Sequence, residues 1–172
     1  EKLLADLREI YMPKAPTIEV VNIKRVLERV YSLVKDECAK KNIRTEVMID
    51  EKGFLVSWDP SKLEQVFLNV IKNSIEAMGS GGNLSIRGKL SGDKVEISID
   101  DDGCGIPKEH MDKVLDCFFT TKSYGTGLGL CISKKFIEEY DGSSLSVKSE
   151  EGKGTTVNVT LTLHSGEVLN PL

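Results

Sequence analysis

The strands predicted for this chain come in adjacent pairs, and this pairing limits the folds that the chain can adopt. Short apolar or alternating runs predict strands at 44–49 and 54–58, at 84–90 and 94–100, and at 145–149 and 155–163. Strands joined directly to their neighbours form antiparallel pairs, whereas parallel strands need a helical crossover. We therefore expect an α/β two-layer sandwich, in which about three helices pack on one face of a mixed, largely antiparallel sheet.

Two of the predicted helices begin with a clear capping signal. Asn22 precedes a helix that ends near residue 41, and Asp59-Pro60 opens a helix that runs to Met78. A capping oxygen accepts hydrogen bonds from the first free amides, and proline needs no donor at the first helical position. The apolar faces are expected to carry Val26, Leu27, Val30, Leu33 and Val34 in the first helix and Leu63, Val66, Phe67, Val70 and Ile71 in the second. Further helices are expected at 108–116 and 128–140.

Composition excludes several classes of protein. The 172 residues contain 23 Lys and Arg against 27 Asp and Glu, which gives a net charge of −4 and the size of one ordinary domain. Because no excess of positive charge is available to follow a phosphate backbone, nucleic acid is not an expected partner. No apolar run approaches the roughly 18 residues of a membrane span. We expect a cytoplasmic domain, and membrane anchoring of a longer parent protein stays open.

The two ends of the chain are expected to lie outside the folded domain. The first eleven residues carry one apolar helical stripe, and Pro13 and Pro16 then exclude regular helix. A local cap packed on the same domain is the alternative for this short piece. We divide the chain into the end of a longer helix, a hinge, a folded domain and a tail, at residues 1–12, 13–16, 17–164 and 165–172.

The cysteines show no pattern of a zinc site or a redox motif. Cys38, Cys104, Cys117 and Cys131 contain no Cys-x-x-Cys pair, and only two histidines are present. We expect four reduced thiols that line the core or a pocket.

The segment NVIKNSIEAM, residues 69–78, places two amides on one face of the second capped helix. Asn69 and Asn73 are one turn apart and lie next to the apolar stripe. Either amide can be a buried hydrogen-bonding group that is satisfied within the core. The functional alternative is a carboxamide oxygen that ligates Mg²⁺, an ion that takes few protein ligands when it also holds phosphates.

The turn DDGCGIP, residues 101–107, follows an alternating strand. The carboxylate of Asp101 is placed to accept a hydrogen bond from the exocyclic amino group of adenine. Guanine has an acceptor at that position, so a buried carboxylate would reject guanine by on the order of several kcal/mol. Gly103 and Gly105 let the backbone turn sharply and lie against a flat ligand. A simple tight turn is the alternative.

The segment CFFTTKSYGTGLGL, residues 117–130, places three glycines before a periodic helix. Backbone amides and a helix N-terminus in this arrangement can hold phosphate oxygens, with side-chain contacts from Lys122 and Thr126. The glycine spacing fits neither the dinucleotide-binding turn nor the Walker loop. A flexible loop with glycine hinges is the alternative.

Taken in order, NVIKNSIEAM, DDGCGI, FFTTK and GTGLGL resemble the N, G1, F and G2 boxes of the ATP-binding catalytic domain of bacterial sensor histidine kinases. The resemblance covers roughly residues 17–163 and includes DPSKLEQVFLNVIKN and SEEGKGTTVNVTL. The FFTTK-x-x-GTGLGL run is similar in particular to the nitrogen-regulator branch. The family implies the Bergerat fold, bound ATP and Mg²⁺, and a mobile lid over the phosphates.

The resemblance implies roles for individual residues. Asn73 matches the asparagine that binds Mg²⁺, Asp101 matches the aspartate that reads adenine, and Lys122 matches a phosphate contact. Asn69, Asn73 and Lys122 are the implied catalytic residues. The remaining nucleotide-binding positions are Gly103, Gly105, Ile106, Phe119, Thr121, Gly125, Thr126, Gly127, Leu128 and Gly129.

Asn69 favours the kinase branch over related ATPases. In gyrase-type topoisomerases, the heat-shock chaperone of ninety kilodaltons, mismatch-repair ATPases and anti-sigma serine kinases, the matching residue is usually a glutamate that acts as general base. An amide cannot take a proton, so Asn69 suits transfer to a neutral imidazole, which already carries a lone pair. A module that hydrolyses ATP and a pseudokinase that only binds nucleotide are the alternatives.

The acceptor histidine of such a kinase is not recognisable here, since neither His110 nor His164 has the His-Glu/Asp-x-x-x-Pro setting. The family implies that the acceptor lies on a dimerisation domain of the same protein and that a response regulator receives the phosphoryl group. We expect the fragment to be monomeric and its parent to be homodimeric. Cys117 and Asp102 stand where the family often has proline and asparagine, which puts local packing and lid dynamics in doubt.

Overall fold

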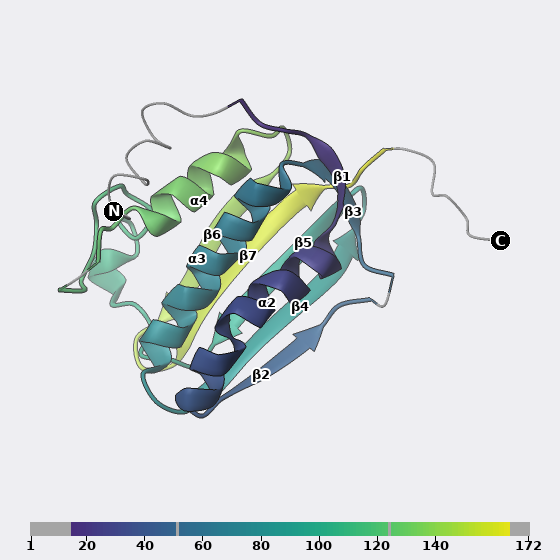
Figure 1. The fold of residues 1–172 in the computed structure, drawn as a ribbon. Coiled ribbons are helices and arrows are strands. Elements are labelled where there is room, and N and C mark those ends of the chain that lie inside the picture. The colour runs from purple at the N-terminus through teal and green to yellow at the C-terminus, as the bar shows by residue number, and fades with distance from the viewer. Residues whose placement is uncertain (1–14, 51, 124, 166–172) are drawn as a thin grey trace.

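The computed structural model describes residues 15–50, 52–123 and 125–165. Its elements alternate between long helices and directly connected strands (Figure 1). In chain order they are β1 (Glu19–Asn22), α2 (Ile23–Lys40), β2 (Ile43–Met48), β3 (Leu55–Trp58), α3 (Pro60–Met78), β4 (Gly82–Ser91), β5 (Lys94–Asp101), the 3₁₀ helix η1 (Lys108–His110), α4 (Gly129–Glu138), β6 (Ser144–Glu150) and β7 (Gly154–Thr162).

Five of the strands form one mixed sheet in the order β2-β4-β5-β7-β6. Every neighbouring pair is antiparallel except β2 and β4, which run parallel and are connected through β3 and the helix α3. The helices α2, α3 and α4 lie side by side over one face of this sheet (Figure 1). β1 and β3 pair separately in a two-stranded ribbon. The predicted two-layer sandwich is confirmed.

Both predicted helix caps are present. The side chain of Asn22 accepts a hydrogen bond from the Lys24 amide at 3.0 Å, and Asp59 accepts from the amides of Ser61 at 2.9 Å and Lys62 at 3.3 Å. The predicted apolar faces are buried, with one exception. Leu33 lies at the edge of the α2 stripe and is 64% exposed, so its assignment to the core is wrong.

The β4–β5 hairpin provides the centre of the sheet. Its strands pair up to Ser91 and Lys94, which leaves a two-residue connection between them. Val95, Ile97 and Ile99 are completely buried beneath the helices, as their alternation predicts. The opposite face is polar; there Arg87 pairs with Asp100 at 2.7 Å. One face of the sheet therefore belongs to the core and the other to solvent.

Contacts at the start of α3 and the end of α4 hold these two helices together. Lys62 is almost fully buried, forms an ion pair with Glu139 at 2.7 Å and lies 4.8 Å from the centre of the Phe136 ring. The rings of Trp58 and Tyr140 stack at 3.8 Å. These contacts fix the place of α4 against α3, which matters because both helices contribute to the predicted site.

The predicted helix at 108–116 is wrong. Only Lys108–His110 forms a short 3₁₀ helix, and turns follow it. Hydrogen bonds there span three residues, for example from the Lys113 amide to the His110 carbonyl at 3.0 Å. Its apolar residues Met111, Val114 and Leu115 span only about one helical turn, and so short a stripe gives little packing energy to stabilise an α-helix.

The predicted helix at 1–12, the first half of the hinge at 13–16 and nearly all of the tail at 165–172 lie outside the described residues, and the domain boundaries stay predictions. His164, next to the tail, is anchored: its Nδ1 lies 2.7 Å from the Ser57 hydroxyl, and its amide donates to the Leu55 carbonyl at 2.8 Å. Within the described ranges, no helix is both long enough and apolar enough to span a membrane.

Replacing the cap of α3 should destabilise the domain. Burial raises the pKa of Asp59, but hydrogen bonds from Ser61, Thr17 and Lys62 lower it more, so the pKa lies below its ordinary value of 3.8. We expect Asp59→Ala to reduce the free energy of unfolding by about 1–2 kcal/mol in urea denaturation at neutral pH. The difference in the free energy of unfolding between the variant and the parent protein should shrink as the pH falls from 3.8 through the lowered pKa. Protonated Asp59 no longer stabilises the parent protein through its charge.

Asp36→Ala is the matched control, because Asp36 is exposed within α2. It should change the free energy of unfolding by less than about 0.5 kcal/mol. Equal effects of the two substitutions would contradict the capping role of Asp59.

Candidate functional site

Hydrogen bonds join all three predicted motifs at one end of the molecule. The Cys104 amide of the turn after β5 donates to the Ala77 carbonyl of α3 at 3.1 Å. From the loop before α4, Lys122 reaches Asn73 on α3. The connection from β5 to α4 lies beside the C-terminal half of α3, at the left of Figure 1. Segments about 50 residues apart in the sequence, such as those of Asn73 and Lys122, therefore meet in one place.

Asp101 is held rigidly at the end of β5. It is only 8% exposed, and its carboxylate accepts hydrogen bonds from the Gly103 amide at 3.1 Å, the Ser74 side chain and the Thr155 amide. Burial raises the pKa of this carboxyl above its ordinary value of 3.8, although these hydrogen bonds act in the opposite direction. A buried, oriented acceptor of this kind can select for a ligand that carries a donor.

The carboxamide oxygen of Asn73 accepts a hydrogen bond from a positively charged side chain. The Lys122 ammonium donates to Asn73 Oδ1 at 3.0 Å and also forms an ion pair with Glu76. The oxygens of Asn73 and Glu76 are hard ligands, and together they already hold a cation. They therefore fit an ion such as Mg²⁺, which takes few protein oxygens when phosphates supply the others. Among the described residues, no group of three or more His, Cys, Asp or Glu side chains could hold a metal by itself.

Asn69 has a structural role in this structure. Its amide nitrogen donates to the Gly129 carbonyl at 3.2 Å and to the Ser133 hydroxyl at 3.4 Å, across from α3 to the first turn of α4. Ser133 is fully buried and also bonds to Gly129. Asn69 thus fixes the start of α4, where the predicted phosphate-binding amides lie.

The glycines of the turn after β5 are needed for packing within the protein. A Cβ at Gly103 would lie 2.8 Å from the Ala77 carbonyl carbon, and one at Gly105, which has φ +67°, would overlap the Glu150 carbonyl. The sequence suggested a flat ligand as the reason for these glycines, whereas the structure shows close approach to α3 and to the end of β6. The following amide, of Ile106, donates to the Ser149 hydroxyl at 2.9 Å.

The loop before α4 is closed at its base. The Phe118 amide donates to the Gly127 carbonyl at 2.9 Å, and a Cβ at Gly127 would overlap the Phe118 backbone. Within the loop, Gly125 donates to the Lys122 carbonyl at 3.2 Å, and the Thr126 hydroxyl accepts from the Leu128 amide at 3.4 Å. These contacts gather the predicted glycine-rich segment beside the N-terminus of α4, which begins at Gly129.

Three predicted nucleotide-binding positions differ in what they offer. The Leu128 side chain is completely buried in the core, so it is not available to a ligand. The Phe119 ring lies 5.3 Å from the His110 ring, and Thr121 is exposed. Leu128 thus serves the fold, whereas the other two remain accessible to a ligand.

Cys117 and Cys131 are paired in a disulfide, which corrects the expectation of four reduced thiols. Their Cα atoms are 5.1 Å apart. The pairing could not be expected from their separation of 14 residues, because it arises from the closed base of the loop between them. Cys38 is buried and Cys104 is exposed, and both are free.

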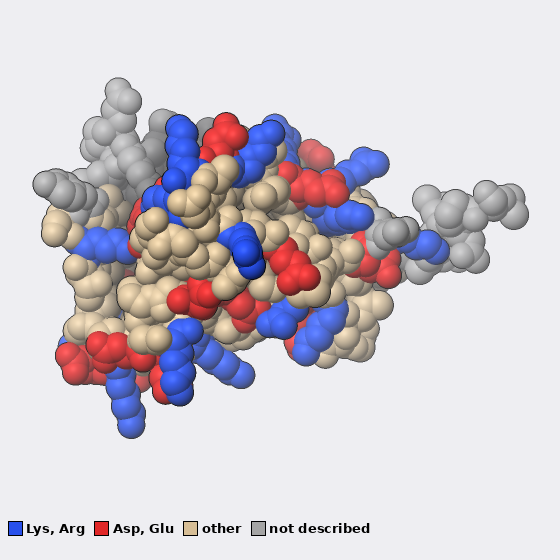
Figure 2. All heavy atoms as spheres, turned by 90° about the horizontal axis from the view of Figure 1, so that it is seen from below, with Lys and Arg blue, Asp and Glu red and all other residues tan. Residues whose placement is uncertain are grey.

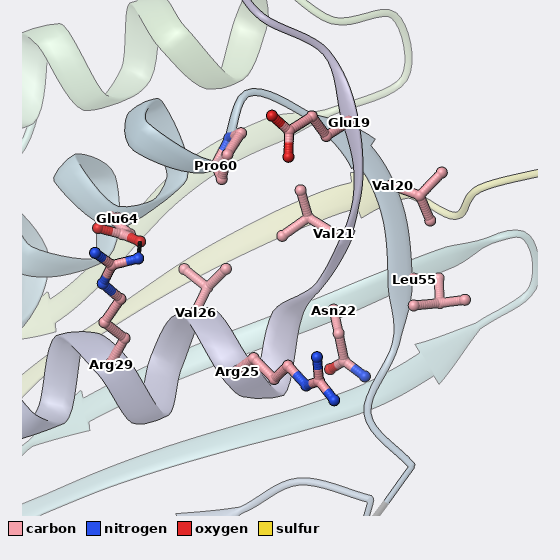
Figure 3. Close-up of a pocket in the computed structure, with 10 residues that line it drawn as sticks. All are labelled: Glu19, Val20, Val21, Asn22, Arg25, Val26, Arg29, Leu55, Pro60 and Glu64. Atoms are coloured by element: carbon pink, nitrogen blue, oxygen red, sulfur yellow. Dashed lines mark ion pairs between the residues drawn. The ribbon is translucent and has the colours of Figure 1, made fainter.

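A pocket of about 480 Å³ lies elsewhere, between the β1–β3 ribbon and the first turns of α2 and α3. Figure 3 shows Arg29 and Glu64 paired at 3.2 Å on one side and Val20 and Leu55 on the other. None of the residues that line it belongs to the predicted nucleotide site. We therefore do not assign the nucleotide to this pocket.

Sequence reasoning missed two residues of the site. Ser74 binds the Asp101 carboxylate, and Glu76 binds the Lys122 ammonium. Both left a signal in the sequence. Ser74 is a polar residue at a buried position of the α3 stripe, and Glu76 follows Asn73 by three residues, a spacing that places both on one helix face.

Substitution of Gly105 should distinguish the cost of a steric overlap from the cost of an unfavourable backbone conformation. We expect Gly105→Ala to reduce the free energy of unfolding by more than about 2 kcal/mol in urea denaturation, because it adds a backbone overlap to an unfavourable φ. The matched control is Gly152→Ala, since Gly152 has φ +77° and open space around its missing Cβ. It should cost only about 1 kcal/mol. Equal costs would show that the contact with Glu150 is unimportant.

This chain is similar to solved structures and to curated proteins. The catalytic domain of histidine kinase ThkA superposes with a TM-score of 0.78 and 31% identity, over 86% of this chain and 96% of that one. Sporulation kinase C of Bacillus subtilis (strain 168) is 36% identical over 95% of this chain and 38% of its own length. Sensor histidine kinase ZraS of Salmonella typhimurium (strain LT2) is 34% identical over 93% of this chain and 34% of its own length. This chain spans between 22% and 38% of the first three such relatives.

A family model gives the broader assignment. Residues 58–165 match the model described as "Histidine kinase-, DNA gyrase B-, and HSP90-like ATPase". This range includes α3, the turn after β5 and the glycine-rich loop, and so all the site residues described above. The chain therefore belongs to the histidine kinase-, DNA gyrase B- and HSP90-like ATPase family, with the fold of a histidine kinase catalytic domain.

Proposed function

We propose that this chain is the ATP-binding catalytic domain of a sensor histidine kinase. It binds ATP with Mg²⁺ and transfers the γ-phosphoryl group to a histidine on a dimerisation domain of the same protein. The observation that carries this proposal is that two separate motifs reach adjacent residues of α3: Asp101 bonds to the Ser74 side chain, and Lys122 bonds to Asn73. A nucleoside triphosphate requires a group that binds its nucleobase, here a carboxylate. It also requires an oxygen ligand for its metal ion and a positive charge, here a lysine, for its phosphates.

At the adenine end of the site, Asp101 accepts a hydrogen bond from the amino group of adenine. Its neighbours hold the carboxylate in one orientation, so no rearrangement is needed when the base arrives. Guanine would place an acceptor against this buried acceptor, so the site selects ATP over GTP.

At the phosphate end, Asn73 and Glu76 supply oxygens and Lys122 supplies a positive charge. When bound, Mg²⁺ would neutralise charge on the phosphates. Because Mg²⁺ and Lys122 would compete for the Asn73 oxygen, Lys122 would leave Asn73 and bind a phosphate oxygen. Catalysis in such a site consists mainly of positioning and charge neutralisation.

Asn69 supports transfer to histidine rather than hydrolysis. Its amide is engaged with Gly129 and Ser133, and an amide is no general base. Water needs such a base, whereas a neutral imidazole attacks with its own lone pair. Rapid hydrolysis in the absence of an acceptor is therefore disfavoured.

The partners follow from the same proposal. A structure of ThkA in complex with response regulator TrrA superposes with a TM-score of 0.79 and 27% identity, over 48% of that chain. By analogy, we propose that a receiver domain takes the phosphoryl group, that this fragment is monomeric and that its homodimeric parent presents it to the cytoplasm. On the face drawn in Figure 2, basic and acidic side chains alternate without a basic stripe. The expectation that nucleic acid is not a partner stays a prediction. The nitrogen-regulator branch stays a prediction.

Replacing Asp101 should reduce adenine binding and base selectivity. We expect Asp101→Asn to weaken ATP binding by about 1–3 kcal/mol in calorimetry, because a charge-assisted hydrogen bond is lost. The preference for ATP over GTP should narrow with it. Asp102→Asn is the control, since it changes an exposed neighbouring carboxylate and should leave the base preference unchanged. An unchanged ATP affinity in Asp101→Asn would contradict the assignment of the adenine end.

Transfer to a separate acceptor tests the function directly. Incubated with labelled ATP and Mg²⁺, the chain should phosphorylate an added dimerisation domain with an acceptor histidine but should not label itself. Asn73→Ala should weaken Mg²⁺-dependent nucleotide binding by more than about tenfold and abolish transfer, whereas Lys72→Ala, exposed on the same helix, should not.

Two results would contradict this proposal, the first its kinase activity and the second its separate acceptor. Appreciable phosphate release without any acceptor would favour a hydrolysing ATPase module. Stable labelling of His110 or His164 would show that the chain contains its own acceptor.

A further inference from the structure

We propose that Cys117 and Cys131 form a reversible redox site that controls the glycine-rich loop, and that their disulfide weakens binding of ATP with Mg²⁺. The regulatory part of this inference rests on the proposed ATP-binding function. The two cysteines bracket the segment that carries Lys122, Gly125 and Gly127. A bond between them therefore ties the two ends of the loop that is proposed to cover the phosphates.

The separation of the two Cα atoms is compatible with a disulfide. The Cα atoms lie 5.1 Å apart, inside the range of about 4.4–6.8 Å that disulfides require. Cys117 is exposed and Cys131 is half-buried, so small thiols and disulfides in solution can reach the pair. Cys38 is buried, and neither Cys38 nor Cys104 is bonded to another cysteine.

Backbone contacts bring the two cysteines together independently of the bond. The residue after Cys117, Phe118, donates its amide to Gly127 at 2.9 Å and has φ +68°. A side chain at Gly127 would overlap the Phe118 backbone, so the two chain segments at the base of the loop are in direct contact. The buried Leu128 then anchors the end of the loop in the core, just before α4. Cys117 and Cys131 are thus neighbours because of the fold.

The oxidation is a pair of exchange steps with a low-molecular-weight disulfide such as oxidised glutathione. The Cys117 thiolate attacks one sulfur of that disulfide, forms a mixed disulfide and releases one thiol. The Cys131 thiolate, in the first turn of α4 where negative charge is stabilised, then attacks the Cys117 sulfur and releases the second thiol. The protein loses two protons and two electrons, and the small disulfide is reduced to two thiols. Excess thiol reverses both steps.

The disulfide-bonded structure shows why oxidation would weaken nucleotide binding. In it, the Lys122 ammonium occupies Asn73 and Glu76, the oxygens proposed for Mg²⁺. Binding requires Lys122 and the neighbouring glycines to move relative to α3. A bond across the loop base removes conformational freedom from this segment and so favours the arrangement with Lys122 on α3. In the cytoplasm, disulfides are usually transient and redox-sensing, which agrees with a regulatory role.

The experiment compares the fully reduced protein with protein equilibrated with oxidised glutathione. Peptide mapping by mass spectrometry identifies the cross-link, thiol titration counts the free cysteines, and calorimetry measures the affinity for a non-hydrolysable ATP analogue with Mg²⁺. Oxidation should join Cys117 to Cys131 and weaken binding by about fivefold or more. In Cys104→Ser, which lacks the other exposed thiol, oxidation should reduce the free thiols from three to one. Dithiothreitol should restore all three values.

Single substitutions identify the responsible pair. Cys117→Ser and Cys131→Ser should each lose both the cross-link and the effect of oxidation on affinity. Cys104→Ser should retain both, because its thiol lies outside the pair. Absence of the Cys117–Cys131 cross-link, or a verified cross-link that leaves affinity unchanged or increased, would overturn the proposal.

Failure of the proposed function gives a different result. The cross-link is detected without nucleotide, whereas the affinity of the reduced protein tests ATP binding alone. Reduced protein that binds no nucleotide would overturn the ATP-binding function and, with it, the regulatory part of this proposal. The cross-link would still decide whether the cysteines form a redox site.

Discussion

The contact between α3 and the turn after β5 holds the whole site together. Cys104 bonds through its amide to Ala77, and Ser74 bonds to the Asp101 carboxylate. This contact exists only because Gly103 has no side chain to separate the two backbones. It sets the distance between the proposed adenine end, on β5, and the proposed metal end, on α3. Both ends would be lost together if α3 moved away from the sheet.

A second constraint concerns charge. Asn73 and Glu76 place oxygens on the exposed flank of α3, and an unpaired cluster of this kind attracts a cation. In this structure the cation is Lys122, from the glycine-rich loop. The proposed metal site and the loop are therefore coupled, since a metal ion and Lys122 compete for the same oxygen. This competition gives the loop two arrangements and makes the Cys117–Cys131 pair at its base a place where regulation can act.

Much of the fold could be predicted because the relevant signals are local. Asn22 and Asp59 cap their helices through amides only two or three residues away, and Val95, Ile97 and Ile99 alternate with polar residues along one strand. Predictions from local signals were wrong where contacts with distant elements determine which residues are buried. Leu33 continues a helical stripe but lies at its uncovered edge, and the segment at 108–116 forms a short 3₁₀ helix followed by turns in place of the predicted α-helix.

The sequence by itself determined the order of the elements, the boxes of the family and the residue types at the proposed site, because these depend on spacing along the chain. Only the tertiary structure decided how they are used. It showed that Asn69 braces α4, that Gly105 makes room for Glu150, and that Cys117 lies against Cys131. The physical reason is that such contacts join segments between 14 and 60 residues apart, whose distance in space is set by packing of the core and not by any local preference.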